Sequence, residues 1–497
     1  MATKTRADWH EAANNIKIDG RAFINGKAVD ALSGETRPNV SPGDGRDLGP
    51  VAYCGTEDAD LAIGIARKTF ESGVWSRMAP SDRKMIMLRW AELIKKHEEE
   101  LALLECLDVG KPIDNTLNID VFAAIRTTSW SGEAIDKWYD EIPPTPADTL
   151  ALVQRLPLGV VAAIVPWNFP LSTTAWKLAP AIATGNSVIL KPATNTPLTA
   201  IRMAQLATEA GLPDGVLNVL PGSGGSLGKH LSMHMGIDGL TFTGSTPVGK
   251  LLMQYSGLSN LKRTFLELGG KSPNIVFADA NLEAAASMAA VAVFYNGGQT
   301  CTAGTRLIVE EKIHDRFVEM VIENARGWMP NDPLDPATTM GPMIDKPQFD
   351  TVDGYVGVGR EEGAELVFGG KGCREDSGGH YYEPTIFTGV NNKMRIAQEE
   401  IFGPVLSVMT FKTAEEAVAI ANDSIYGLAG AVWSNNINTA HKVAEAVRVG
   451  TMGINNYFGG DITVPFGGFK QSGNGRDKSI HAFHDYTELK TTWIEFE

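Results

Sequence analysis

The chain has 497 residues, of which 43% are hydrophobic and 21% are charged, and its formal net charge is −15. Because this length exceeds what one hydrophobic core serves, we expect two or three domains. The acidic balance argues against nucleic acid or an anionic membrane as a partner, and four scattered cysteines argue against a zinc site or a disulfide framework.

The first hundred residues combine a short β region, FINGKAVDALSGE, with helical periodicity from about Asp58 to Glu105. After residue 150, short β-branched runs alternate with helical stretches, and each run ends in Pro or Gly: GVVAAIVP, NSVILKPA, GVLNVLPG and GLTFTGS. This alternation predicts a parallel sheet with helices on both faces. A second α/β series follows Ser272 and includes the late strands PVLSVMTF and GLAGAVWS, so we place the boundary between the two units at LELGGKS, residues 266–272.

The ends of the strands in the first unit have the composition of a ligand site. In an open parallel sheet, ligands bind at the carboxyl ends of the strands. In the last of these ends, FTGSTPVGK, Ser245 or Thr246 is a possible N-cap before Pro247. The free backbone N–H groups of such a helix start can bind an anion. An ordinary capped turn with no ligand has the same residues and is the alternative. Lys191 ends another strand, where it is either solvated or holds the hydroxyls and phosphates of a nucleotide. Together the strand ends favour a dinucleotide.

Three residues have side chains that could take part in catalysis: a thiol, a carboxyl and an amide. Cys301 lies between two threonines in GGQTCTAG, with the small polar neighbours of an accessible thiol, although a single cysteine is more often an inert core residue. Glu267, between two leucines, is predicted to be partly desolvated, which raises the pKa of a carboxyl toward the range of a general base; a surface glutamate is the alternative. Asn168 is an amide in an apolar segment and could stabilise an oxyanion.

The motifs PWNFP, LELGGKSP, GQTC, EEIFGPV and PFGGFKQSGNGR occur in an order that resembles the NAD(P)-dependent aldehyde dehydrogenase superfamily over essentially the whole chain. The resemblance implies an α/β fold with a Rossmann-like cofactor domain, an α/β catalytic domain and a small β oligomerisation arm, assembled as a homodimer or homotetramer. The expected divisions are a cofactor domain of residues 1–128 and 152–266, a catalytic domain of 267–454, an arm of 129–151 and 478–497, and a substrate and anchor loop of 455–477.

The resemblance also implies roles for individual residues. Cys301 resembles the nucleophile, Glu267 the general base, Asn168 the oxyanion-hole amide, and Lys177 the lysine that helps to pass the proton of the base outward. The expected reaction passes through a thiohemiacetal and a thioester, and water is the final acceptor because Glu267 is present. The expected cofactor contacts are Val165, Pro166, Trp167, Lys191, Thr194, Gly224, Gly244, Ser245, Val248, Leu268, Glu400 and Phe402.

Three positions depart from the family pattern. Thr194 stands where relatives that prefer NAD often carry a glutamate that repels a 2′-phosphate, so we expect NADP to be accepted beside NAD. Gly225 replaces a common proline. Asp477 replaces a common glutamate, which puts a proton-relay role at that position in doubt.

The substrate side is predicted to be aromatic, which suits an apolar or cationic aldehyde. Asp120 and Asp461 either bring negative charge to the mouth of the substrate pocket or are solvated loop residues. The loop NNYFGGDITVPFGGFKQSGNGRDKS resembles the branch that oxidises ω-aminoaldehydes, including γ-glutamylaminobutyraldehyde. The expected substrate contacts, with no metal ligand among them, are Asp120, Phe169, Thr173, Trp176, Tyr295, Thr302, Tyr457, Asp461 and Phe466.

Other interpretations stay open at this point. A broad aliphatic aldehyde dehydrogenase is the alternative within the family, and outside it the chain could be a thiol hydrolase or a cofactor-binding structural protein that has lost redox activity. None of the nine histidines stands in a nucleophile–base pattern, which disfavours the hydrolase. The opening residues lack a secretory signal, and the most apolar run is interrupted by prolines, so we expect a cytoplasmic protein.

Overall fold

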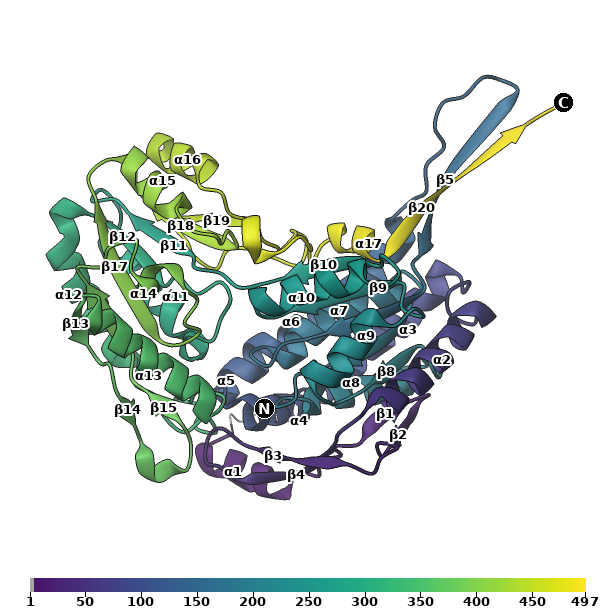
Figure 1. Ribbon diagram of the computed structural model, residues 1–497, viewed down its shortest axis with the longest axis horizontal. Coiled ribbons are helices and arrows are strands. Elements are labelled where there is room, and N and C mark those ends of the chain that lie inside the picture. The colour runs from purple at the N-terminus through teal and green to yellow at the C-terminus, as the bar shows by residue number, and fades with distance from the viewer. Residues whose placement is uncertain (1–3) are drawn as a thin grey trace.

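The computed structural model describes residues 4–497, which form two α/β units and a projecting arm (Figure 1). The first unit contains a seven-stranded sheet in the order β10-β9-β6-β7-β8-β1-β2. The strands β10 to β8 of this order are parallel, as the sequence predicts, and β1 and β2 add an antiparallel edge. The bounds are β1 (Ala22–Ile24), β2 (Lys27–Val29), β6 (Val160–Ile164), β7 (Ser187–Lys191), β8 (Leu217–Val219), β9 (Gly239–Thr243) and β10 (Arg263–Glu267).

Helices cover both faces of this sheet. Successive side chains of a strand point to opposite faces, and β6 shows it: Val161 and Ala163 belong to one hydrophobic cluster, while Val160 and Ala162 belong to another. Because both faces are buried, the strands are apolar throughout rather than alternating. The main helices are α2 (Thr56–Ser72), α3 (Pro80–Lys96), α4 (Glu98–Val109), α6 (Phe122–Ala134), α7 (Pro170–Ala183), α8 (Leu198–Glu209) and α10 (Thr246–Gly257).

The second unit contains another seven-stranded sheet, in the order β13-β16-β17-β12-β11-β18-β19. Its strands are parallel except for β13 at one edge. The strands are β11 (Pro273–Val276), β12 (Arg306–Glu310), β13 (Glu365–Phe368), β16 (Thr385–Thr388), β17 (Val405–Phe411), β18 (Ala429–Trp433) and β19 (Thr451–Ile454), and the main helices are α11 (Leu282–Phe294), α12 (His314–Ala325), α13 (Lys346–Glu361), α15 (Ala414–Asn422) and α16 (Ile437–Ala446).

The arm is an antiparallel pair of long strands, β5 (Thr149–Pro157) and β20 (Thr487–Glu495), that extends away from both units (Figure 1). Its limits differ from the sequence-based division. Strand β5 continues to residue 157 rather than ending at 151, and residues 129–134 belong to α6, which packs on α3. The short helix α17 (His481–Asp485) precedes β20, so residues 478–486 lie at the base of the arm.

No helix within residues 4–497 has both the length and the apolar character that crossing a bilayer requires.

Candidate active site

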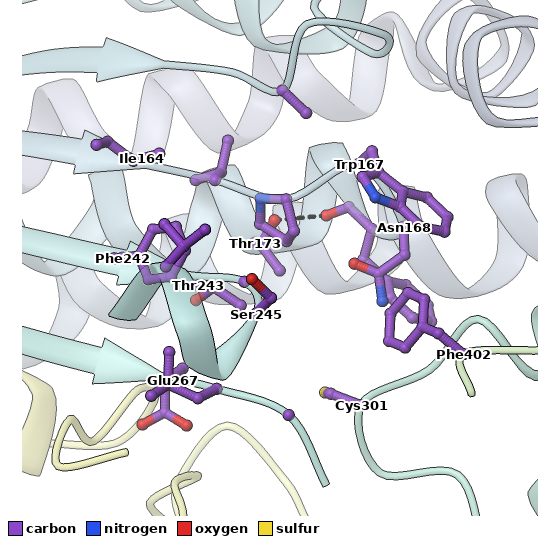
Figure 2. A pocket seen from close by; sticks show the side chains of 18 of the residues that line it. Ile164, Trp167, Asn168, Thr173, Phe242, Thr243, Ser245, Glu267, Cys301 and Phe402 are labelled. Carbon is purple, nitrogen blue, oxygen red and sulfur yellow. Dashed lines mark hydrogen bonds between the residues drawn. The ribbon is translucent and has the colours of Figure 1, made fainter. Parts of the chain in front are cut away.

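A cavity of about 800 Å³ lies at the carboxyl ends of β6, β9 and β10 and is closed from the other side by loops of the second unit (Figure 2). It brings together Cys301, Glu267 and Asn168, which are separated widely in the chain. Figure 2 shows the sulfur of Cys301 pointing toward the middle of the cavity, with Asn168 above it and Glu267 across from it. The predicted cofactor residues that line it are Val165, Pro166, Trp167, Gly224, Gly244, Ser245, Val248, Leu268, Glu400 and Phe402, and the predicted substrate residues are Asp120, Phe169, Thr173, Trp176, Tyr295, Thr302 and Phe466.

The glycines before Cys301 are required by the path of the chain. After α11, Asn296, Gly297 and Gly298 adopt positive φ angles of 53°, 62° and 71°. A Cβ on Gly298 would lie 2.1 Å from the carbonyl oxygen of Gly403, so the backbones can approach only because there is no side chain. The turn presents Cys301 half-buried at the cavity wall. Burial, followed by the charges of Glu400 and Glu267, raises the pKa of its thiol to about 12, so the thiol is protonated near neutral pH.

Asn168 is held rigidly beside Cys301. Its Nδ2 atom donates to the main-chain carbonyl of Gln299 at 2.9 Å, and the main-chain carbonyl of Asn168 accepts from Nδ2 of Asn296 at 3.1 Å. A carboxamide has two N–H donors, and within residues 4–497 only the first has a partner. The second N–H is therefore available to an oxygen atom bound in the cavity.

Glu267 is buried at the end of β10, and neither of its carboxyl oxygens has a hydrogen-bond partner among the described residues. Burial raises the pKa of this carboxyl well above its ordinary value, the charge of Asp477 raises it further, and the charge of Lys177 lowers it. The desolvation expected from the two leucines is thus confirmed. Gly467 leaves the space for this side chain, since a Cβ there would lie 2.7 Å from Oε1 of Glu267.

Lys177 and Asp477 form a buried ion pair beside Glu267. Nζ of Lys177 lies 2.7 Å from Oδ2 of Asp477, and the two side chains are 1% and 5% exposed. Asp477 also lines the cavity, whereas Lys177 lies behind it. The aspartate therefore keeps an ion pair with the lysine although its side chain is one methylene shorter than the glutamate common in the family. A proton-relay role at this position stays a prediction.

The other end of the cavity has the features of an anion and nucleotide site. Ser245 is the N-cap of α10, but its side chain does not cap the helix, so its hydroxyl and the first N–H groups of the helix remain for a ligand. Glu400 accepts the N–H of Gly270 at 3.2 Å, and burial raises the pKa of its carboxyl to about 7. Phe402, with φ 58°, meets the ring of Trp167 edge-on at 5.2 Å. These groups fit a dinucleotide.

Two predicted cofactor residues do not line this cavity. Nζ of Lys191 donates to the carbonyl of Pro192 at 2.8 Å, and burial lowers the pKa of its amine to about 8. Thr194 donates to the carbonyl of Gly222 at 3.1 Å and faces a separate cavity of about 420 Å³. Ala193, between them in sequence, does reach the main cavity.

The substrate side is aromatic, as predicted. Phe169 stacks on Tyr295 with ring centroids 6.1 Å apart, and Trp176 tilts against Phe466 at 5.2 Å. Phe458, which lies in the predicted substrate loop but was not singled out there, meets Tyr295 edge-on at 6.2 Å. Other lining residues that were missed are Ile119, Ala123, Ser172, Leu251, Tyr255, Gln348 and Thr351. Most of them are ordinary helix residues, so their sequence carries no signal of a site.

Three predicted substrate residues are placed differently. Asp120 reaches the cavity wall, but its carboxylate is paired with Lys111 at 2.9 Å, and both side chains are 0% exposed. Asp461 is exposed, pairs with Arg126 at 3.2 Å and does not line the cavity. Tyr457 also lies outside the lining and donates its hydroxyl to the carbonyl of Thr302 at 2.7 Å, which supports the loop of the cysteine. Neither aspartate is an uncompensated charge at the mouth.

Asp60, His230 and His234 form a cluster of metal-ligand type outside the cavity. The geometry favours hydrogen bonding instead. Nε2 of His230 lies 2.6 Å from Asp60, and the N–H of Gly236 donates to Nδ1 of His234 at 2.9 Å. That bond leaves the proton of neutral His234 on Nε2, the atom that would have to bind a metal.

Comparison with known proteins agrees with this site. The model of the aldehyde dehydrogenase family matches residues 29–492. The NADP/NAD-dependent aldehyde dehydrogenase PuuC of Escherichia coli is 50% identical over 99% of this chain and 99% of its own. Among solved structures, the AldA indole-3-acetaldehyde dehydrogenase of P. syringae, in complex with NAD+ and IAA, is 60% identical with a TM-score of 0.99, and the match covers 99% of this chain and 100% of that chain. The γ-glutamyl-γ-aminobutyraldehyde dehydrogenase of Burkholderia cenocepacia is 53% identical with a TM-score of 0.98 over the same shares. On these matches, the chain belongs to the aldehyde dehydrogenase family.

Proposed function

We propose that this protein oxidises an aldehyde to a carboxylic acid with NAD+ or NADP+. The observation that carries the proposal is the convergence of a thiol, a free amide N–H and a desolvated carboxyl on one cavity, which continues to the N-terminus of α10. A relative of known structure holds NAD+, and another is named as NADP/NAD-dependent. In this proposal the first unit holds the cofactor and the second unit supplies Cys301.

Each residue then has a defined task. Cys301 gives its thiol proton to solvent, its sulfur bonds to the aldehyde carbon, and the oxyanion that forms accepts the free N–H of Asn168. Bound nicotinamide supplies a hydride acceptor, so the carbon is oxidised and a thioester remains on Cys301. Glu267 takes a proton from water, the hydroxyl adds to the acyl carbon, and the C–S bond breaks with its electron pair on sulfur. Overall, an aldehyde, NAD+ and water give a carboxylate, NADH and two protons.

The residues around the cofactor side fit its parts. The N-terminus of α10 with Ser245 suits the pyrophosphate. Glu400 suits the nicotinamide ribose, because one of its oxygens accepts the N–H of Gly270 and the other has no hydrogen-bond donor among residues 4–497. Lys191 would hold the adenosine ribose after giving up its contact with Pro192. Thr194 offers no carboxylate against a 2′-phosphate, which supports acceptance of NADP+.

For the substrate we propose an ω-aminoaldehyde or its γ-glutamyl conjugate, with a broad range of aliphatic aldehydes as the alternative. The support is the name of one close relative and the apolar, aromatic walls formed by Phe169, Trp176, Tyr295 and Phe466. The pairing of Asp120 and Asp461 weakens the case for a free amine and favours the conjugate. An arylacetaldehyde is a second candidate, because the paired rings suit a flat apolar group and another relative is named for such a substrate.

We also propose that the arm joins subunits of a homodimer or homotetramer. Leu489 and Trp493 on β20 are 64% and 57% exposed in the single chain, and one edge of β20 has no partner strand among residues 4–497.

The experiment is a spectrophotometric assay of reduced cofactor with several aldehydes, with NAD+ and NADP+ in turn. We expect formation of NADH and the carboxylic acid in equal amounts. Hydrolysis of an activated ester without any aldehyde-dependent NADH would favour a thiol hydrolase instead. Absence of both activities in folded protein that still binds NAD+ would favour a structural role.

A further inference from the structure

Lys478 does not itself line the active-site cavity, but its ammonium group lies beside a residue of the cavity wall. Its Nζ atom lies 5.5 Å from the centroid of the Trp176 ring, and Trp176 lines the same cavity as Cys301. A Cβ added at Gly460 would lie 4.0 Å from the same Nζ atom. The ammonium group therefore lies between α7 and the loop of residues 455–466, which contributes Phe458 and Phe466 to the cavity wall.

The positive charge of Lys478 is not neutralised by an ion pair. The two carboxylates whose charges raise the pKa of Lys478 each have another partner, Asp477 with Lys177 at 2.7 Å and Asp461 with Arg126 at 3.2 Å. Within residues 4–497, no carboxylate oxygen lies within 4.0 Å of Nζ of Lys478. The residue is half-buried, and burial lowers the pKa of its amine, so its charge is only partly solvated.

The backbone holds Lys478 in a conformation that a residue with a side chain rarely adopts. Its φ is 64° and that of Ser479 is 51°. The turn is fixed on both sides, because Asp477 and Phe466 exchange two backbone hydrogen bonds of 2.8 Å and the N–H of Ser479 donates to the carbonyl of Ile462 at 2.7 Å. Consecutive left-handed residues other than glycine point to a functional constraint on where the side chain goes.

We propose that Lys478 binds a carboxylate at the far end of an elongated aldehyde whose reacting carbon lies at Cys301. The aromatic walls then contact the middle of the ligand, and the ammonium group over Trp176 contacts its anionic end. The inference rests on the proposed aldehyde oxidation and narrows its substrate class. A γ-glutamyl conjugate carries such a carboxylate, whereas a free ω-amine would bring a second cation to Lys478.

The test compares three aldehydes of equal length in the wild type and in two variants, Lys478→Met and Lys478→Glu. The probes are 6-oxohexanoate, hexanal and 6-aminohexanal, assayed by NADH formation. We expect the wild type to favour 6-oxohexanoate over hexanal by about tenfold in kcat/KM, because of a lower KM for 6-oxohexanoate. This preference should become smaller at high salt. Lys478→Met should remove this preference and leave hexanal within about twofold, and Lys478→Glu should invert it in favour of 6-aminohexanal. Lys4→Met is the matched control, since Lys4 also lies over a tryptophan, Trp9, at 4.6 Å.

The proposal is overturned if the variants keep the wild-type preference, or if they lose hexanal and 6-oxohexanoate equally. If hexanal is still oxidised in such a case, the proposed aldehyde oxidation stands. If the wild type forms NADH from none of the aldehydes, the proposed function itself is refuted. A variant that fails to fold does not end the test. In the wild type, adipate should then compete with hexanal at least about tenfold more strongly than adipamide, and equal inhibition would refute the role of Lys478.

Discussion

Asp477→Asn tests how the buried carboxyl cluster sets the pH dependence of the reaction. The pKa of Glu267 is raised by burial first and by the charge of Asp477 second. Activity that needs ionised Glu267 is therefore lost as the pH falls through this raised pKa. Replacing Asp477 by the neutral amide removes a like charge, favours the ionised form and lowers the pKa of Glu267. The acid limb of kcat must then move to lower pH.

The expected change in the pKa of Glu267 follows from the charges around it. A nearby charge moves a pKa by about 1–3 units. Burial also raises the pKa of Asp477, so this carboxyl is itself partly protonated in acid, and we take the lower part of that range, about 1–2 units. The same substitution leaves Lys177 buried without a counter-charge, although the amide still accepts a hydrogen bond from it. We therefore expect a loss of about 3 kcal/mol of stability, at the lower end for a broken buried pair.

The assay is the pH profile of kcat for wild type, Asp477→Asn and Asp477→Glu, with thermal unfolding measured in parallel. Asp47→Asn is the control, because it makes the same change of charge at a residue that is exposed and outside the cavity, where the carboxyl accepts the N–H of Gly49 at 2.9 Å. Asp477→Glu should restore both the acid limb and the stability. An acid limb of Asp477→Asn that stays in place, or moves to higher pH, in folded protein would refute the electrostatic link between the two carboxyls.

Three further substitutions test the remaining assignments. Cys301→Ala should abolish turnover and keep NAD+ affinity, because the thiol acts on the aldehyde; turnover above a few per cent would exclude it as nucleophile. In rapid mixing, Glu267→Gln should give a burst of NADH followed by slow turnover, since activated water is needed only for hydrolysis. Steady-state turnover equal to that of the wild type would show that Glu267 has a structural role instead. Thr194→Glu should lower kcat/KM for NADP+ by about ten- to a hundredfold, the scale of a like-charge clash of about 1.4–3 kcal/mol. The control Thr194→Val only removes the hydrogen bond to Gly222 and should keep the kcat/KM for NADP+. Unchanged NADP+ kinetics in Thr194→Glu would place the ribose elsewhere.

The sequence by itself determined the features that depend on neighbours in the chain. Apolar runs ending in Pro or Gly predicted the parallel strands β6 to β9, because strands buried on both faces need continuous apolar side chains. The leucines beside Glu267 predicted its desolvation, and the small polar neighbours of Cys301 predicted an accessible thiol, which the structure places half-buried at the cavity wall. These properties are local, so a reading of adjacent residues could reach them.

Only the tertiary structure decided which charges are compensated. Lys177 and Asp477 are 300 residues apart, and Lys111 and Arg126 neutralise the two aspartates that the sequence left as mouth charges. Lys478, by contrast, has no ion pair within residues 4–497, and its neighbour Trp176 lies on a distant helix. The strength of a charge in a site depends on its burial and on partners brought near by folding, and neither can be read from its place in the chain.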